Sequence, residues 1–252
     1  MEKITSRKNR MIAELRELGR SAEARREKCA FLCDSPKLLK EALQCGAEIS
    51  SVFWKEGGAE ALPVPVLTQF LLPADLFDYA SPMVSSPGPL FVCAMPKRGD
   101  AQAPRNAIVL ENVQDPGNVG TVIRTANALG IGAVLLVGAC ADLYHPKTVR
   151  ATMGAIFRQR VEKHTVASLQ RLLSAWKMPL AGAVLSERAE NILQTDLTCC
   201  ACAVGSEGSG LSRELIDLCS REVIIPMQPE SESLNAAVAA SIIMWEMRGR
   251  AI

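Results

Sequence analysis

The C-terminal part of the chain, from about residue 106, alternates between two hydrophobic patterns. Short apolar runs fit buried strands, and longer segments with apolar residues three or four positions apart fit amphipathic helices. Strands are predicted at 107–111, 133–137, 160–162, 180–185, 199–204 and 222–225, and helices at 118–130, from 147, at 166–176, 211–218 and 233–248. This alternation is typical of a parallel sheet with helices on both faces, so we predict an α/β fold.

The N-terminal part has a different pattern. A basic helix is predicted over 1–28, with its periodic part at 4–28, and a small α/β domain over 29–95. In that domain the pattern predicts strands at 29–33, 49–54, 64–67 and 90–95, and helices at 35–45 and 73–79. Residues 96–105 combine proline, glycine and charge without periodicity, which indicates a linker. The remaining residues, 106–252, form the expected C-terminal domain.

Charge changes this picture only locally. The net charge of the 252 residues is +1, but residues 1–28 hold nine Lys and Arg against five Asp and Glu. Such a segment suits a contact with nucleic-acid phosphate, and it equally fits a solvated amphipathic face. The N-terminus lacks an apolar core, and the longest nearly continuous apolar run, 131–141, is too short for a membrane span. We therefore expect a cytoplasmic protein without a membrane segment.

The nine cysteines do not predict disulfides or a metal site. Most lie in apolar stretches, where cysteine acts as a small hydrophobe. Cys199 and Cys202 form a C-x-x-C, but they lie in a predicted strand, and His145 and His164 are the only histidines in the sequence. We expect no metal.

Two loops carry the candidate chemistry. Asp115-Pro116-Gly117 predicts a turn with Asn118 as the N-cap of a helix that Gly130 ends. Arg124 then lies one turn below the helix start, on the face opposite the apolar residues, where it either binds an anion or is an ordinary surface arginine. Further on, residues 205–210 form a glycine-rich loop that lacks the spacing of the dinucleotide and phosphate-loop fingerprints. Alone, it reads as an ordinary βα turn.

Taken together, three segments point to one family. They are NVQDPGNVGTVIRTANALG at 112–130, GSEGSGLS at 205–212, and IIPM at 224–227 followed by SESLNAAVAA at 231–240. In this order they closely resemble the three motifs of the SpoU/TrmH family, the RNA ribose 2′-O-methyltransferases of the SPOUT superfamily. The resemblance covers about residues 106–250.

The resemblance implies a SPOUT parallel-sheet domain with a C-terminal trefoil knot, preceded here by a small RNA-binding domain. It further implies S-adenosylmethionine as cofactor, a homodimer that shares its active sites, and RNA as partner. By resemblance, the catalytic or positioning residues are Asn118, Arg124, Glu207, Ser233 and Asn235, and the cofactor contacts are Gly205, Ile225, Met227 and Leu234. The choice between Arg124 and Glu207 as general base stays open.

The expected reaction is methyl transfer to a ribose 2′-hydroxyl. The motifs are poor in aromatic residues that could stack an unstacked base, which favours a sugar acceptor over a base. The extra N-terminal domain favours 23S rRNA as the substrate, by analogy. The alternatives are a tRNA 2′-O-methyltransferase, a non-catalytic RNA-binding or ribosome-assembly protein, and a nucleotide-binding α/β oxidoreductase.

Overall fold

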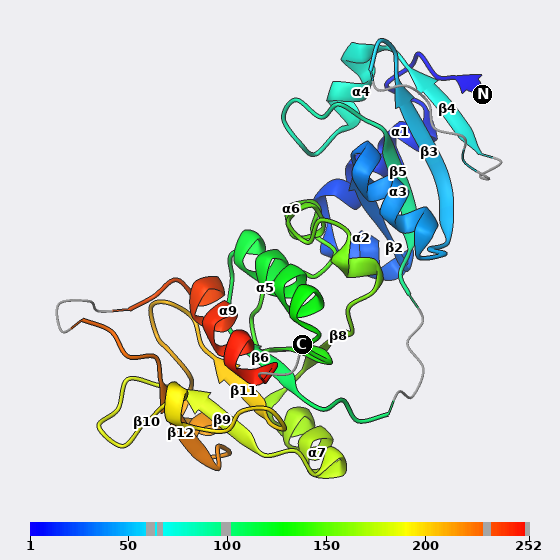
Figure 1. Cartoon of the computed structure of the whole chain (residues 1–252). Helices are drawn as coiled ribbons and strands as arrows, with labels where there is room; N and C mark the ends of the chain where they lie inside the picture. Colours follow the sequence, from blue (N-terminus) through cyan, green and yellow to red (C-terminus); the bar gives the residue numbers. More distant parts are fainter. Residues whose placement is uncertain (59–63, 65–67, 97–101, 229–232, 250–252) are drawn as a thin grey trace. The chain divides into compact units, whose positions relative to one another are not determined.

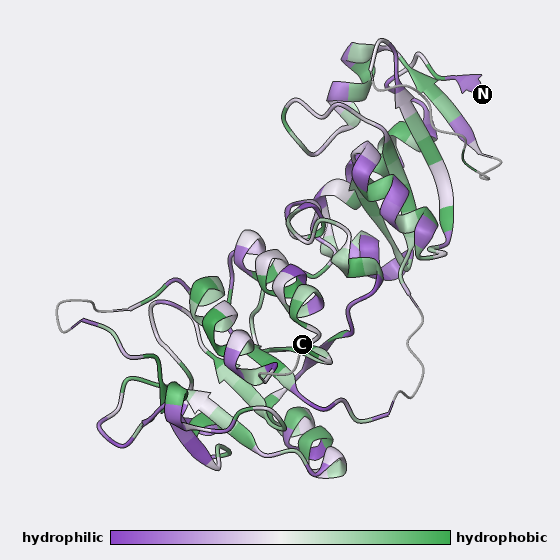
Figure 2. Ribbon diagram, viewed as in Figure 1, coloured by the Kyte–Doolittle hydropathy of each residue, from purple (hydrophilic) through white to green (hydrophobic). Residues whose placement is uncertain are grey.

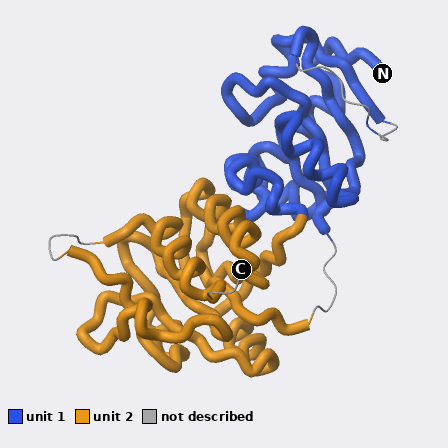
Figure 3. The backbone as a smooth tube through the Cα atoms, in the orientation of Figure 1, with its two compact units in different colours: residues 1–99, 142–157 blue, residues 100–141, 158–252 orange. Residues whose placement is uncertain are grey.

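The computed structural model describes the chain except for residues 59–63, 65–67, 97–101, 229–232 and 250–252. The chain forms two compact units (Figure 3). Unit 1 comprises residues 1–99 and 142–157, and unit 2 comprises residues 100–141 and 158–252. Each unit has a sheet of its own. None of the described helices is long and apolar enough to cross a membrane.

Unit 2 is built on a seven-stranded sheet in which all neighbouring strands are parallel (Figure 1). The strand order is β10 (Glu190–Asn191), β12 (Arg221–Ile224), β9 (Leu180–Ala183), β11 (Ala201–Val204), β6 (Ala107–Glu111), β7 (Ala133–Val137) and β8 (Val161–His164). The central strands β6, β7 and β11 are buried along their whole length, which explains their apolar sequences. The predicted α/β class with a parallel sheet is confirmed.

Helices cover both faces of this sheet. The alternate residues Ala107, Val109 and Leu135 pack with α7 (Val166–Trp176) and α8 (Arg213–Ile216) in one buried cluster. Helices α5 (Pro116–Leu129) and α9 (Ala236–Met247) pack against each other, and α9 also contacts β11 (Figure 1). Figure 2 shows the hydrophobic residues concentrated in the strands between these helices. The ends of the strands are not covered by these helices and lead into the connecting loops.

Unit 1 contains a five-stranded mixed sheet in the order β1 (Glu2–Lys3), β4 (Gln69–Leu72), β3 (Ile49–Lys55), β5 (Leu90–Ala94) and β2 (Ala30–Asp34). β5 runs antiparallel to both of its neighbours. The unit also contains α1 (Arg10–Arg20), α2 (Ala22–Glu27), α3 (Pro36–Gln44), α4 (Ala74–Ala80) and α6 (Pro146–Ala151). Its apolar residues form one buried cluster with α1 and α4, and another with α3 and α6.

The prediction of one helix over the N-terminal segment was wrong. Residues 2–3 pair with β4 as a strand, and the helix starts only after Asn9, whose side chain accepts the amide of Met11. Ser21 then divides the helical part into α1 and α2, since its amide closes α1 while its side chain caps α2. Gly19 does not interrupt α1, because it lies buried inside that helix against Pro82.

Two smaller differences concern strands. The predicted strand at 64–67 falls mostly on residues outside the described structure, and the strand found nearby is β4. The short strand β10 and the 3-10 turn after it, Ile192–Gln194, were not predicted. Two residues are too few to show an alternating pattern, so the sequence carried no signal for β10.

Residues 142–157 follow β7 in the chain but belong to unit 1 (Figure 3). Val149 and Ile156 are buried in the cluster that α3 and β2 form, and the ring of Tyr144 lies 4.7 Å from that of Phe31. The boundaries drawn from the sequence assigned this stretch to the domain 106–252. Its apolar side chains instead complete the core of unit 1, so the chain passes between the units three times.

A buried ion pair fastens the start of this segment. The Arg25 side chain is 1% exposed, and its Nε and Nη2 donate to Oδ2 of Asp142 at 2.9 and 2.5 Å. Its Nη1 donates to the carbonyl of Leu18 at 2.6 Å. A buried guanidinium needs such partners, since an uncompensated buried charge is strongly destabilising.

Replacing Arg25 by alanine should therefore destabilise unit 1 by about 3 kcal/mol, because the change leaves Asp142 and the Leu18 carbonyl without their donor. Denaturant unfolding of the full chain measures this. The neighbouring Arg26, which is exposed, provides the matched control, and Arg26→Ala should change stability by less than about 0.5 kcal/mol. Equal effects of the two substitutions would contradict the importance of the buried pair.

Candidate functional site

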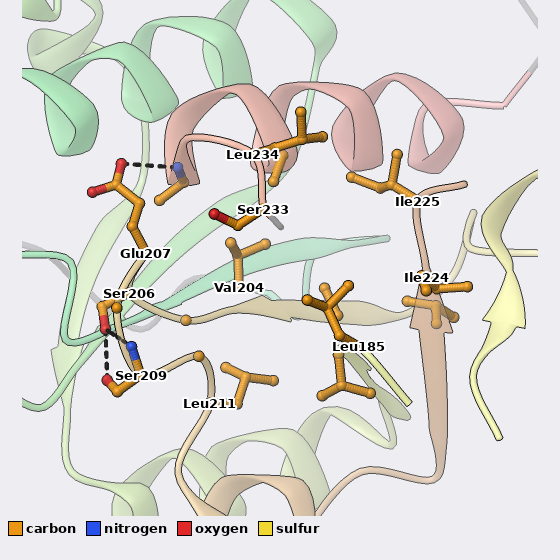
Figure 4. A pocket seen from close by; sticks show the side chains of 18 of the residues that line it. Leu185, Val204, Ser206, Glu207, Ser209, Leu211, Ile224, Ile225, Ser233 and Leu234 are labelled. Carbon is orange, nitrogen blue, oxygen red and sulfur yellow. Dashed lines mark hydrogen bonds between the residues drawn. The ribbon is translucent and has the colours of Figure 1, made fainter. Parts of the chain in front are cut away.

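A cavity of about 500 Å³ opens at the carboxyl ends of β9, β11 and β12 (Figure 4). Its size is that of a small-molecule pocket, and the carboxyl ends of parallel strands are where open α/β sheets bind ligands. Leu234 and Ile225 lie on one side, and Leu185 and Leu211 on the other. The lining residues come from the ends of the strands, the glycine loop and the start of α9, and include Val204, Gly205, Ser206, Glu207, Ser209, Ile224, Met227, Ser233 and Ala236.

The glycine loop is held in a tight fold by its own backbone. A Cβ atom on Gly205 would lie 2.1 Å from both the carbonyl carbon and oxygen of Gly210, so the two backbones approach too closely for any side chain. The Gly210 amide donates to the Ser206 carbonyl at 2.9 Å, and the Ser206 and Ser209 hydroxyls lie 2.7 Å apart. These contacts close the loop and leave Glu207 at its tip.

The Glu207 carboxylate joins three segments that are distant in the sequence. Its Oε1 accepts from Nδ2 of Asn118 at 2.9 Å and from Nδ2 of Asn235 at 2.5 Å. The backbone amide of Ala236 donates to the same oxygen at 3.1 Å. Asn235 Nδ2 also lies 3.2 Å from Oδ1 of Asn118. The three predicted residues Asn118, Glu207 and Asn235 therefore form one hydrogen-bonded network beside the cavity.

Helix capping explains how the two asparagines reach this carboxylate. Asn235 is the N-cap of α9, and its Oδ1 accepts from the amides of Ala237 and Val238. Its Nδ2 is then left for Glu207. Asn118 was predicted as an N-cap, and this was wrong. Asp115 caps α5 by accepting the Asn118 amide at 2.8 Å, with Pro116 at the first helical position, so the Asn118 side chain is free to cross to Glu207.

Six predicted residues line the cavity. They are Glu207, Gly205, Ile225, Met227, Ser233 and Leu234. Ile225, Met227 and Leu234 are half-buried, and Ser233 is exposed. Their individual roles stay predictions. Leu185, Val204 and Ile224 were not predicted, because apolar residues at strand ends look like core residues in a sequence. Only the parallel sheet shows that the carboxyl ends of these strands meet.

Arg124 is the one predicted site residue that lies away from this group. It is exposed on α5 and is not among the residues that line the cavity. It follows Asn118 by six residues, which is about 9 Å along a helix axis. Gly120, one turn before it on the same helix, is buried. Within one chain, the described structure does not bring Arg124 to the network around Glu207.

The C-x-x-C cysteines are not among the residues that line the cavity. Cys202 is buried in β11, and burial raises the pKa of its thiol well above the usual range, while Cys199 is exposed. Burial also raises the pKa of Cys200 to about 11. A raised pKa makes these two buried thiols weaker nucleophiles at neutral pH. Among the residues that the structure describes, His, Cys, Asp and Glu side chains form no cluster that could hold a metal ion.

Comparison with known proteins now identifies the family. The sequence profile of the SpoU rRNA Methylase family matches residues 105–245. The chain belongs to this family. It is 31% identical to the 23S rRNA guanosine 2′-O-methyltransferase RlmP of Bacillus subtilis, over 99% of this chain and 100% of that protein.

Solved structures of similar proteins extend the match to the whole fold. An RNA 2′-O ribose methyltransferase is 28% identical, with a TM-score of 0.82 over 97% of both chains. The AdoMet-bound rRNA methyltransferase of Sinorhizobium meliloti has a TM-score of 0.87 over 98% of this chain and 97% of that one. At 24% identity, this second likeness concerns the fold alone. Both units of the chain thus have counterparts in proteins of known structure.

Substituting Gly205 tests the tight loop. Gly205→Ala should destabilise the chain by about 2 kcal/mol and weaken S-adenosylmethionine binding. The reason is that the new methyl group would overlap the backbone of Gly210, which can move away only by distorting the loop. Gly208→Ala is the matched control in the same loop, since a Cβ there has nothing within 4 Å. Thermal unfolding and calorimetric titration measure both effects. If Gly205→Ala and Gly208→Ala behave alike, the close backbone approach is not what shapes the cavity.

Proposed function

We propose that this chain is an S-adenosylmethionine-dependent methyltransferase that modifies a ribose 2′-hydroxyl of 23S rRNA. One observation carries the proposal, namely that the cavity at the strand ends borders the network of Asn118, Glu207 and Asn235. A pocket for a small molecule and a polar group that can hold a second reactant are thereby adjacent. Family membership and the similarity to RlmP over its whole length support the reaction and the substrate class.

The cavity fits S-adenosylmethionine by the nature of its lining. Val204, Ile224 and Leu234 supply apolar surface for an adenine ring, and the bare backbone at Gly205 supplies amide and carbonyl groups. Ser206, Ser209 and Ser233 contribute hydroxyl groups to the lining. When bound, the cofactor supplies a methyl group activated by a sulfonium centre. The Sinorhizobium meliloti protein, which shares the fold, binds AdoMet.

The residues beside the cavity are suited to positioning. A methyl transfer to a hydroxyl requires the oxygen to be held at near-attack distance, and the charge that develops on it to be stabilised. Asn118 and Asn235 are fixed by Glu207, and the Oε1 atom that fixes them already accepts three donors. We infer that Glu207 holds this arrangement together, and that Arg124 stabilises or deprotonates the hydroxyl.

A homodimer would bring Arg124 to such a site. Helix α9 carries two exposed apolar side chains, Val238 at 47% and Trp245 at 54%, and it packs beside α5, which carries Arg124. Exposed large apolar groups on neighbouring positions of a helix face favour association. We propose that a second copy covers this face, so that Arg124 acts in a site shared by two subunits. We also propose that the C-terminal part of the chain forms the trefoil knot that the family resemblance implies.

Unit 1 is proposed to bind the RNA. Some basic side chains of the N-terminal segment are not available for phosphate because they form ion pairs within the chain. Lys3 pairs with Glu56, Arg25 with Asp142, and Lys28 with Glu14. Exposed cations remain, among them Lys8, Arg10 and Arg20. We also propose that the chain acts in the cytoplasm, because its proposed substrate is ribosomal RNA.

The remaining alternatives differ in support. A tRNA substrate would use the same chemistry, but RlmP, to which the whole chain is similar, modifies 23S rRNA. A non-catalytic RNA-binding protein would have no need for the intact network of Asn118, Glu207 and Asn235. The oxidoreductase alternative was wrong, because the family match assigns the chain to the methylases.

The product tests the function directly. Alkaline cleavage of RNA requires a free 2′-hydroxyl, so a ribose-methylated linkage survives as a resistant dinucleotide. Incubating 23S rRNA with the full chain and methyl-labelled S-adenosylmethionine should place the label in such a dinucleotide. Label on single nucleotides would refute the ribose assignment, and label on tRNA but not on 23S rRNA would refute the substrate.

Arg124→Ala should lower methyl transfer by about 100-fold while leaving S-adenosylmethionine affinity nearly unchanged, because Arg124 lies outside the cavity and acts on the acceptor. Turnover and calorimetric titration separate the two quantities. Arg171→Ala, which removes an exposed arginine from α7, is the control and should change neither. Comparable turnover of the Arg124→Ala variant and the parent would remove Arg124 from the site.

A further inference from the structure

Glu111 is a buried acid outside the site described above. It is the last residue of β6 and is 2% exposed. Burying a carboxylate is costly unless both of its oxygens find donors. Here a single residue supplies both, since the Ser212 amide donates to Oε2 at 2.7 Å and the Ser212 hydroxyl donates to Oε1 at 2.6 Å.

Ser212 lies between the glycine loop and helix α8. It follows the glycine loop directly and is the N-cap of α8, with its Oγ accepting the amide of Leu215 at 3.2 Å. The hydroxyl therefore donates its proton to Glu111 and accepts from the helix, which uses both of its functions. The loop that carries Glu207 is held at one end by β11 and at the other by Glu111.

The residue after Glu111 fixes another loop. Asn112 has a left-handed backbone with φ of 55°, and its Oδ1 accepts the amide of Ala139 at 2.8 Å. Its own amide donates to the carbonyl of Val137 at 3.1 Å. The end of β6 is thus tied to the end of β7 as well as to the glycine loop, and from it the chain leads within a few residues to Asn118.

We propose that Glu111 is a positioning residue for methyl transfer. By holding Ser212, it sets the position of the glycine loop, and with it the shape of the cofactor cavity and the placement of Glu207 against Asn118. Glu111 touches neither reactant and acts only through the loop. This inference rests on the proposed function for its meaning in catalysis, whereas its effect on the loop is independent of that function.

Glu111→Gln is the sharpest variant. Glutamine keeps the size of the side chain, but its NH₂ group replaces one of the two acceptor oxygens, so either the amide or the hydroxyl proton of Ser212 loses its acceptor. The affinity for S-adenosylhomocysteine, measured by calorimetry, should fall by about tenfold, and amide hydrogen exchange in residues 205–212 should become faster by a similar factor. Glu214→Gln, the same change at an exposed position of α8, should alter neither.

A second pair of variants tests Ser212, the residue that donates to Glu111. Ser212→Ala removes the hydroxyl and should weaken binding, and Ser212→Thr, which retains it, should recover most of the loss. If Glu111 were merely structural, Glu111→Gln would lower the unfolding temperature and leave the affinity, turnover and exchange rates of the folded protein unchanged. That result would overturn the inference. A parent chain that binds no S-adenosylhomocysteine would refute the proposed function, while loop exchange in Glu111→Gln would still decide the role of Glu111.

Discussion

The site depends on one carboxylate oxygen. Oε1 of Glu207 accepts hydrogen bonds from Asn118 on α5 and from Asn235 and Ala236 at the start of α9. Hydrogen bonds to an ionised acceptor are stronger than those between neutral groups, and a shared acceptor makes each of them depend on the others. The glycine loop, the first motif and the last helix are thereby fixed to one another at the mouth of the cavity.

The parallel sheet makes this meeting possible. β6 and β11 are neighbours, so their carboxyl ends deliver the loops that lead to Asn118 and to Glu207 at the same edge. The same edge brings Glu111 at the end of β6 to Ser212 beyond the glycine loop. The cavity and the network are therefore two consequences of one strand arrangement, and the chemistry proposed for the chain requires both.

Local signals in the sequence predicted much of this fold, and long-range contacts account for what they missed. The helix 166–176 was predicted to the residue from its pattern of apolar positions, and the structure shows that Thr165 caps it. Asn118 was mistaken for a cap, since a sequence does not show that Asp115 takes this role while Asn118 reaches a residue 89 positions away. The pairing of Glu111 with Ser212, 101 positions apart, had no local signal at all. Motif resemblance supplied the predicted site residues, and only the structure shows that Arg124 lies away from the cavity of its own chain.

We propose that Glu207 organises the site and is not its base, and comparing two substitutions tests this most directly. Glutamine can present an oxygen to the same three donors, so Glu207→Gln should retain methyl transfer within about tenfold of the parent. Glu207→Ala removes the acceptor and should lower transfer by about 100-fold, because Asn118 and Asn235 lose their fixed positions. If Glu207→Gln is as inactive as Glu207→Ala although both variants are folded, the reaction requires the basicity of the carboxylate, and the account is wrong.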